Sequence, residues 1–281
     1  MGQMNLGPKS ELIISIDFGT TFTGVAYALS SNLTGGDPSR IAENVKVIKT
    51  WPSASQHYSE KTPTIIAYSS DPPSWGATVK RQDETQVSHF KLGLQPNVGT
   101  HYRRPPPISN SPQSALPFLS NVNWKHPQFP EKTALDFCAD YLTCVHRYIK
   151  EVFLPRQYGA VFLRNQEISY IITVPAIWTD SAKELTRQAA VRAGIPDDKL
   201  DLITEPEAAA LYCATLGEEV DLEEGDRFLV CDAGGGTVVR DLPNGMLTSN
   251  RTLFRIWCYL GSLSLWRNVR LDREEHVVPC I

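Results

Sequence analysis

Residues 228–237 read Phe-Leu-Val-Cys-Asp-Ala-Gly-Gly-Gly-Thr, and this stretch decides the fold that we expect. The apolar run 228–231 predicts a buried strand, because it is β-prone and is bounded by a polar segment and by glycines. Glycines let backbone N–H groups approach an anion closely, and Asp232 at the end of the strand can hold a divalent cation, directly or through water. A glycine-rich hairpin turn has the same pattern, so this stretch alone leaves both interpretations open.

Residues 12–29 carry the same chemistry a second time. An apolar run ends at Asp17, and Phe18-Gly19-Thr20-Thr21 leads into a second β-prone run. We therefore expect two strand–Asp–Gly/Thr hairpins, far apart in the sequence, to face each other across one cleft. Such a pair would clamp a polyphosphate and its metal ion.

Both hairpins resemble the two phosphate-binding loops of the actin-like ATPase superfamily. Within it, the chain is most similar to the seventy-kilodalton heat-shock chaperones, especially to their divergent fungal-type relatives. Two further segments carry the resemblance: Ile-Thr-Val-Pro-Ala at 172–176 and Leu-Ile-Thr-Glu-Pro-Glu-Ala-Ala-Ala at 202–210. The resemblance implies an α/β fold, namely a ribonuclease H-like lobe whose mixed sheet is flanked by helices, with the second lobe incomplete.

The resemblance also implies the roles of individual residues. Asp17 and Asp232 would organise the water shell of Mg²⁺, while Glu205 would align the attacking water and Pro175 would help to convey nucleotide state between lobes. The catalytic group implied in this way is Asp17, Lys91, Glu205, Asp232 and Thr237. The backbone groups expected to hold the phosphates of ATP or ADP belong to Gly19, Thr20, Thr21, Gly234, Gly235, Gly236 and Thr237.

Some of these residues also have a purely structural interpretation. Lys91, expected to neutralise the terminal phosphate, could equally be a solvated surface lysine, and Lys80 and Arg81 compete for its role. Pro175 would also serve to end a strand. Glu205 would also supply favourable charge at a helix N-terminus, worth about 0.3–1 kcal/mol.

Spacing of apolar residues gives the organisation of the chain. It predicts a long helix over 133–152 and strands over 168–174 and 200–204. A helix is expected to start at the capping box Ser181–Glu184 and to end before Gly194, which supplies a left-handed cap. A further helix is predicted from Glu205, with Pro206 in its first turn. Alternating strands and helices indicate a mixed sheet covered by helices.

The domain organisation that we expect has four parts. Residues 1–10 are a disordered lead-in, and 11–215 form the first lobe with a peripheral insertion around 60–130. Residues 216–239 begin the second lobe, and 240–281 are a divergent tail. Eight prolines between Gln95 and Pro130 predict a loop rather than a packed helix.

Composition limits the function. A net charge of −4 gives no argument for nucleic-acid or anionic-membrane binding. No secretory signal is visible, and the apolar run 253–266 is shorter than the roughly 20 residues of a membrane span. Six cysteines without metal-ligand spacing predict reduced, buried thiols, and hence a cytoplasmic protein.

The resemblance ends after Thr237. The family carries a second aspartate where this chain has Val239, and residues 240–281 show no clean periodicity. The adenosine-binding segment and any peptide-binding domain are missing as well. We therefore expect a truncated chain with an unrelated tail, weak affinity for ATP and little hydrolysis.

The leading functional prediction is an ATP-binding, chaperone-like ATPase domain that uses Mg²⁺, with possible protein clients or co-chaperones. The first alternative is a non-hydrolysing nucleotide-binding remnant, a pseudo-ATPase. The second is a sugar or polyol kinase of the same superfamily. A P-loop ATPase is excluded, because no glycine-rich loop ending in Lys-Ser/Thr is present.

Overall fold

The computed structural model describes residues 11–33, 43–53, 58–95, 126–215, 228–233, 238–241, 253–260 and 263–270. Beyond residue 212 the description covers the backbone alone. The predicted lead-in 1–10, most of the proline-rich segment and the glycine turn 234–237 lie outside these ranges.

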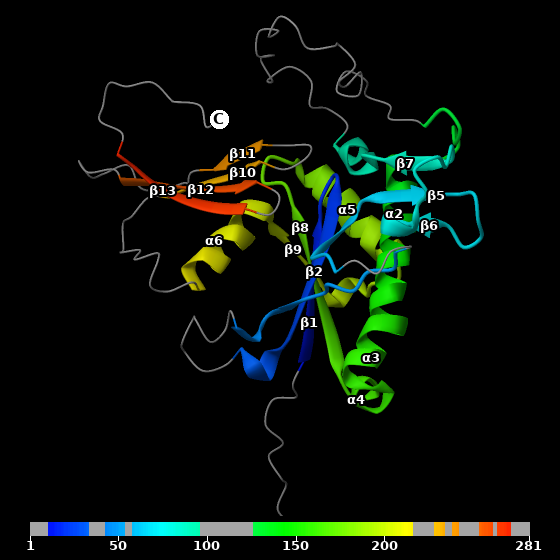
Figure 1. The fold of residues 1–281 in the computed structure, drawn as a ribbon, viewed down its shortest axis with the longest axis horizontal. Helices are drawn as coiled ribbons and strands as arrows, with labels where there is room; N and C mark the ends of the chain where they lie inside the picture. Colours follow the sequence, from blue (N-terminus) through cyan, green and yellow to red (C-terminus); the bar gives the residue numbers. More distant parts are fainter. Residues whose placement is uncertain are drawn as a thin grey trace, which may run out of the picture.

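A mixed sheet forms the centre of the molecule (Figure 1). Its strand order is β3-β2-β1-β8-β9, and β4 pairs with β2 beside β3. The hairpin β1–β2 is antiparallel, whereas β8 runs parallel to β1 and β9 runs parallel to β8. The strands are β1 (Glu11–Phe18), β2 (Phe22–Leu29), β3 (Lys46–Val47), β4 (Lys61–Pro63), β8 (Glu167–Val174) and β9 (Leu200–Thr204). The predicted first hairpin and the predicted mixed α/β lobe are both confirmed.

Alternate residues of β1 are buried, which sets the two faces of the sheet. Leu12, Ile14, Ile16 and Phe18 are fully buried, while the residues between them are partly exposed. Burying an aliphatic or aromatic side chain of this size stabilises the fold by about 1.5–3 kcal/mol. The ring of Phe18 stacks on Tyr141 of helix α2 at a centroid distance of 6.0 Å, so the buried face is the one that α2 covers.

Helix α2 (Ala134–Arg147) continues through the π-helical turn η5 (Tyr148–Phe153) into α3 (Leu154–Tyr158). The predicted helix over 133–152 therefore exists and extends further. It begins at Thr133, whose hydroxyl accepts from the backbone N–H of Asp136 while the Asp136 carboxylate accepts from the N–H of Thr133. The short helix α4 (Ala160–Arg164) follows at Gly159, where the backbone φ is 81°.

Helix α5 (Asp180–Arg192) starts earlier than predicted, and Ser181 is not its cap. Thr179 takes that place, because its hydroxyl accepts from the N–H of Ala182 at 3.3 Å and leaves Ser181 inside the first turn. At the other end Gly194 has a φ of 89°, which confirms the predicted left-handed cap. Helix α6 (Glu205–Thr215) begins directly after β9, as predicted.

A second, three-stranded sheet lies at the periphery and falls within the predicted insertion. It consists of β5 (Ile65–Ala67), β6 (Ser74–Trp75) and β7 (Gln86–Ser88), with β5 in the middle. Short 3₁₀ turns accompany the strands, of which η3 (Phe90–Leu94) matters for the site. The others are η1 (Ser30–Asn32), η2 (Gly76–Thr78) and η6 (Asp197–Lys199).

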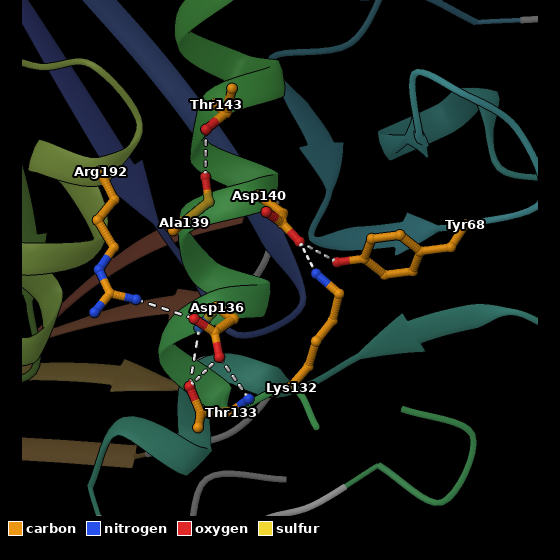
Figure 2. Close-up of polar contacts among 8 residues, drawn as sticks. All are labelled: Tyr68, Lys132, Thr133, Asp136, Ala139, Asp140, Thr143 and Arg192. Atoms are coloured by element: carbon orange, nitrogen blue, oxygen red, sulfur yellow. Dashed lines mark hydrogen bonds and ion pairs between the residues drawn. The ribbon is translucent and has the colours of Figure 1, made fainter. Parts of the chain in front are cut away.

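Tyr68 and Lys132 tie this peripheral sheet to α2 through one carboxylate (Figure 2). Asp140 Oδ2 accepts from Tyr68 Oη at 2.6 Å and from Lys132 Nζ at 2.7 Å, and the Lys132 ammonium lies 4.9 Å from the Tyr68 ring centroid. Burial, together with the hydrogen bond to Asp140, raises the pKa of Tyr68, so the phenol stays a donor at every physiological pH.

The clamp on Asp140 yields a stability prediction. Tyr68→Phe should lower the free energy of unfolding by about 1 kcal/mol, at the low end for a hydrogen bond to a charged group because Asp140 is partly solvated. The matched control is Thr143→Val on the same helix, whose hydroxyl donates only to the Ala139 carbonyl one turn away (Figure 2). Urea unfolding measures both; equal losses would show that the clamp adds nothing.

His146 joins three elements inside the core. Its Nδ1 lies 2.9 Å from the carbonyl oxygen of Ala193, and its Nε2 lies 3.0 Å from Tyr170 Oη. A carbonyl can only accept, so Nδ1 carries the proton of the neutral ring and Nε2 accepts from Tyr170. Burial raises the pKa of Tyr170 to about 12, which keeps its hydroxyl available as that donor.

This environment makes stability depend on pH. Desolvation lowers the pKa of His146 below its ordinary value of 6.5, so in mild acid the unfolded chain takes up a proton that the folded chain resists. Stability should therefore fall as pH drops below about 6.5. His146→Gln should be less stable at neutral pH but should show a shallower loss toward pH ~5 in chemical-denaturation curves. An unchanged slope would contradict this assignment.

Two cysteines fall within the described side chains. Cys138 is buried and Cys144 is half-buried, and both are free thiols. Burial raises the pKa of the Cys144 thiol to about 11, and that of Cys138 further, so neither is activated as a thiolate. The other four predicted thiols have side chains outside the described part.

A four-stranded sheet, known here from its backbone, follows α6. Its order is β11-β10-β12-β13, with β10 parallel to β12 and the other pairs antiparallel. The strands are β10 (Phe228–Ala233), β11 (Val238–Asp241), β12 (Leu253–Leu260) and β13 (Leu263–Arg270). The sheet lies beside α6, on the side of the central strands away from α2 (Figure 1). The strand and the hairpin predicted around Asp232 are present, and β12–β13 add a hairpin that periodicity did not indicate.

Candidate functional site

The turn between β1 and β2 is held rigidly by a neighbouring segment. The Thr64 hydroxyl donates to the Gly19 carbonyl at 2.9 Å, and the Thr64 N–H donates to the Thr21 carbonyl at 2.8 Å. Gly19 is required here because a Cβ would lie 2.2 Å from the carbonyl oxygen of Phe22. The turn predicted to hold phosphates is thus shaped by close backbone approach and by the hydroxyl of Thr64.

Asp17 is the penultimate residue of β1 and lies in a row of paired residues that crosses the sheet. It pairs with Gly24 on β2, and Gly24 pairs with Lys61 on β4. Lys61 Nζ reaches across to Asp17 Oδ2 at 2.8 Å. On the opposite side, Thr173 of β8 donates its hydroxyl to Asp17 Oδ1 at 3.1 Å.

These contacts decide how a metal ion fits Asp17. Both carboxylate oxygens already accept hydrogen bonds, and one of the donors is a cation. Within the described ranges no three metal-ligating side chains gather at one point. A divalent cation that coordinates Asp17 directly would lie close to the like-charged Lys61 ammonium, so the described contacts disfavour direct coordination of Mg²⁺ by this carboxylate. The side chain of Asp232, the other predicted metal residue, lies outside the description.

Lys91 and Glu205 form a second charged pair at the same end of the strands. Lys91 Nζ lies 2.9 Å from Glu205 Oε1, and the two side chains are only 1% and 13% exposed. The ammonium also lies 5.6 Å from the ring centroid of Phe18 and 5.2 Å from that of Trp178. Aromatic faces attract cations, so the two rings stabilise the ammonium in addition to the Glu205 carboxylate.

The burial of Lys91 separates the alternatives left open for it. A solvated surface lysine is excluded, because the side chain is inside the molecule and carries an ion pair. Lys80 and Arg81, the competitors, lie in an exposed turn after η2. Lys91 is therefore the basic residue of this insertion that the fold places beside Glu205.

Glu205 and Pro175 follow neighbouring strands. Strand β8 ends at Val174, and the Pro175 carbonyl accepts from the N–H of Trp178 at 3.1 Å. Strand β9 ends at Thr204, whose hydroxyl accepts from the N–H of Glu207 at 3.3 Å at the start of α6. The local readings of strand end and helix N-terminus are confirmed. Because β8 and β9 are parallel, both residues emerge at the same edge of the sheet as Asp17.

The structure thus gathers part of the predicted site. Asp17 and the Gly19–Thr21 turn lie at this edge, and Lys91 and Glu205 are linked to them through Phe18. Gly234, Gly235, Gly236 and Thr237 fall outside the described residues. Asp232 lies on β10 with Val239 as its cross-strand partner, as backbone positions only.

Lys61 and Thr173 are the contacts of Asp17 that sequence reasoning did not assign. A signal for Lys61 existed in Gly24, a residue without a side chain within a β-prone run, which marks a place where something crosses the strand closely. No local pattern could indicate which residue crosses it.

Comparison with known proteins supports the resemblance at a coarse level. No protein-family model matches the chain. The chain is similar to heat shock 70 kDa protein 12A of Homo sapiens and of Mus musculus, with 26% identity to each over 81% of this chain. It spans 39% of the length of each relative. The match and the mixed α/β lobe are both consistent with the fold of an actin-like ATPase lobe.

The Lys91–Glu205 pair gives the prediction of this subsection. Glu205→Ala should destabilise the protein by about 3–5 kcal/mol, because it leaves a buried ammonium without a partner. Replacing both residues, as in Lys91→Met with Glu205→Gln, should recover much of that loss, since no buried charge remains. Thermal and denaturant unfolding test this; a double variant as unstable as Glu205→Ala would contradict it.

Proposed function

We propose that this chain is a nucleotide-binding lobe of a heat-shock-type, actin-like ATPase, and that the β1–β2 turn holds the phosphates of ATP or ADP. The supporting observation is the turn itself: Gly19–Thr21 is fixed by Thr64 between two lysine–carboxylate pairs, Lys61–Asp17 and Lys91–Glu205. Anions bind where constrained backbone N–H groups and ammonium groups meet.

Each residue has a separate part in this proposal. Backbone groups of Gly19, Thr20 and Thr21 hold the phosphate oxygens. Lys91 offsets the charge that develops on the terminal phosphate, and Glu205 orients the attacking water. Phosphoryl transfer depends mainly on such positioning and electrostatic stabilisation, so preformed pairs suit it. The backbone groups of residues 234–237 would close the site from the other hairpin.

A second candidate is binding without turnover. It is favoured by Val239, which stands where the family carries a second aspartate and pairs across the strands with Asp232. A single-turnover assay separates the two, because hydrolysis releases phosphate whereas a pseudo-ATPase returns intact ATP. Transfer of the phosphate to a sugar would instead support the kinase alternative.

The partners, the location and the subfamily of the protein are also part of the proposal. Protein clients or co-chaperones, a cytoplasmic location and the fungal-type assignment rest on the resemblance. The described helices include none that is both long enough and apolar enough to cross a bilayer.

Calorimetry tests the binding proposal. ADP and ATP should bind at least about tenfold more tightly than adenosine, because the phosphates make the principal contacts. Gly19→Ala should abolish the difference, since its Cβ would collide with the Phe22 carbonyl and reshape the turn.

Gly159→Ala is the matched control. It places the same methyl group at another demanding position, with φ 81° at the end of α3, where nothing lies within 4 Å. It should lower stability while leaving nucleotide affinity unchanged. Absence of binding to any nucleotide, or equal effects of the two alanine variants on affinity, would contradict the proposal.

A further inference from the structure

We infer that Lys61 is a built-in cation of the nucleotide site: its ammonium takes the place beside Asp17 where the hydration shell of Mg²⁺ is expected, and phosphate binding by this chain therefore depends only weakly on Mg²⁺. The inference rests on the proposed function and deepens it. It concerns which cation the site uses. The family resemblance implied Mg²⁺, whereas this inference assigns that role to Lys61.

A row of cross-strand partners on three strands places the Lys61 side chain beside Asp17. Asp17, Gly24 and Lys61 are successive cross-strand partners on β1, β2 and β4. The Lys61 side chain passes directly over Gly24: a Cβ on Gly24 would lie 3.4 Å from Lys61 Cγ and 3.6 Å from Lys61 Cε. A methyl group at position 24 would therefore only touch the lysine stem, whereas a branched side chain would extend into the path from Lys61 to Asp17.

The backbone of Lys61 is held in place, so its side chain extends toward Asp17 from a fixed position. The Lys61 carbonyl accepts from the Ser59 hydroxyl at 2.7 Å, and β4 is paired to β2 over its whole length. Thr62 and Thr64, which follow Lys61 along the chain, are buried, and their burial holds this segment in place. The nearby acid Glu60, which directly precedes β4, pairs with Lys49 at 2.8 Å.

The pair remains accessible to an incoming anion. The side chains of Lys61 and Asp17 are 30% and 44% exposed, in contrast to the buried Lys91–Glu205 pair. Solvent-accessible ion pairs contribute little to stability, about 0–1 kcal/mol, so sharing the ammonium with a phosphate has a small cost. An ammonium has three donors, and lysine is a common phosphate ligand.

Electrostatic repulsion opposes the binding of a metal ion beside this lysine. The ammonium and a divalent cation carry like charges, and both would bind the same carboxylate oxygen. Thr173 already donates to the other oxygen. A Mg²⁺ ion with its water shell on Asp17 would lie close to the like-charged Lys61 ammonium, which weakens metal binding there, whereas the ammonium is already placed to neutralise phosphate oxygens.

The test compares ADP affinity with excess Mg²⁺ and with EDTA, by calorimetry on the full chain. The wild-type affinity should change by no more than about threefold between the two conditions. In Lys61→Met it should fall by about tenfold or more in EDTA and recover in part with Mg²⁺, which can then reach Asp17.

Two further variants keep the test specific. Gly24→Val retains the lysine but blocks its path, and a β-branched residue suits a strand, so it should reproduce the Mg²⁺ dependence of Lys61→Met. Lys49→Met removes a surface lysine of the same region and should behave as the wild type does.

The outcomes separate the two proposals. Wild-type binding that needs Mg²⁺ by more than about tenfold, with the same requirement in Lys61→Met, would overturn the role of Lys61 and leave the proposed function intact. A failure of every variant to bind ADP in either condition would overturn the proposed function and, with it, this inference.

Discussion

The register of β1 is the constraint from which the site follows. Every second residue of this strand, ending with Phe18, is fully buried against α2, so a shift by one position would expose the entire apolar set. The same register turns Asp17 to the other face and sets it opposite Gly24. Phe18 is left to pack beside the Lys91 ammonium. One hydrophobic alternation therefore positions both charged pairs.

The two pairs differ in a way that suits different tasks. Lys91 and Glu205 are withdrawn from water, where charges persist only with a partner and hold a defined geometry. Lys61 and Asp17 are half-open to solvent and can exchange partners with little loss. A rigid, buried pair on one face of β1 and an accessible pair on the other are compatible with the proposed binding of a polyanion at the β1–β2 turn.

The peripheral sheet contributes to the site indirectly. Thr64, which fixes the β1–β2 turn, is the single residue between β4 and β5 and so links the central sheet to the peripheral one. The Tyr68–Asp140–Lys132 clamp holds β5 on α2, the helix that also covers Phe18. The shape of the β1–β2 turn is thereby coupled to the packing of α2.

Local patterns in the sequence determined the first hairpin, the helix over 133–152, the strands β8 and β9, and the position of Asp17 and Glu205 at strand ends, because these depend on short-range periodicity and turn residues. Local reasoning failed where two nearby residues were chemically similar: Thr179 and Ser181 can each cap a helix, and in the structure Thr179 is the cap. It could not decide whether Lys91 was buried, nor find Lys61 beside Asp17, since these residues are 114 and 44 positions from their partners. Only the tertiary structure brings such groups together, because cross-strand register and burial are properties of the assembled sheet and not of any segment.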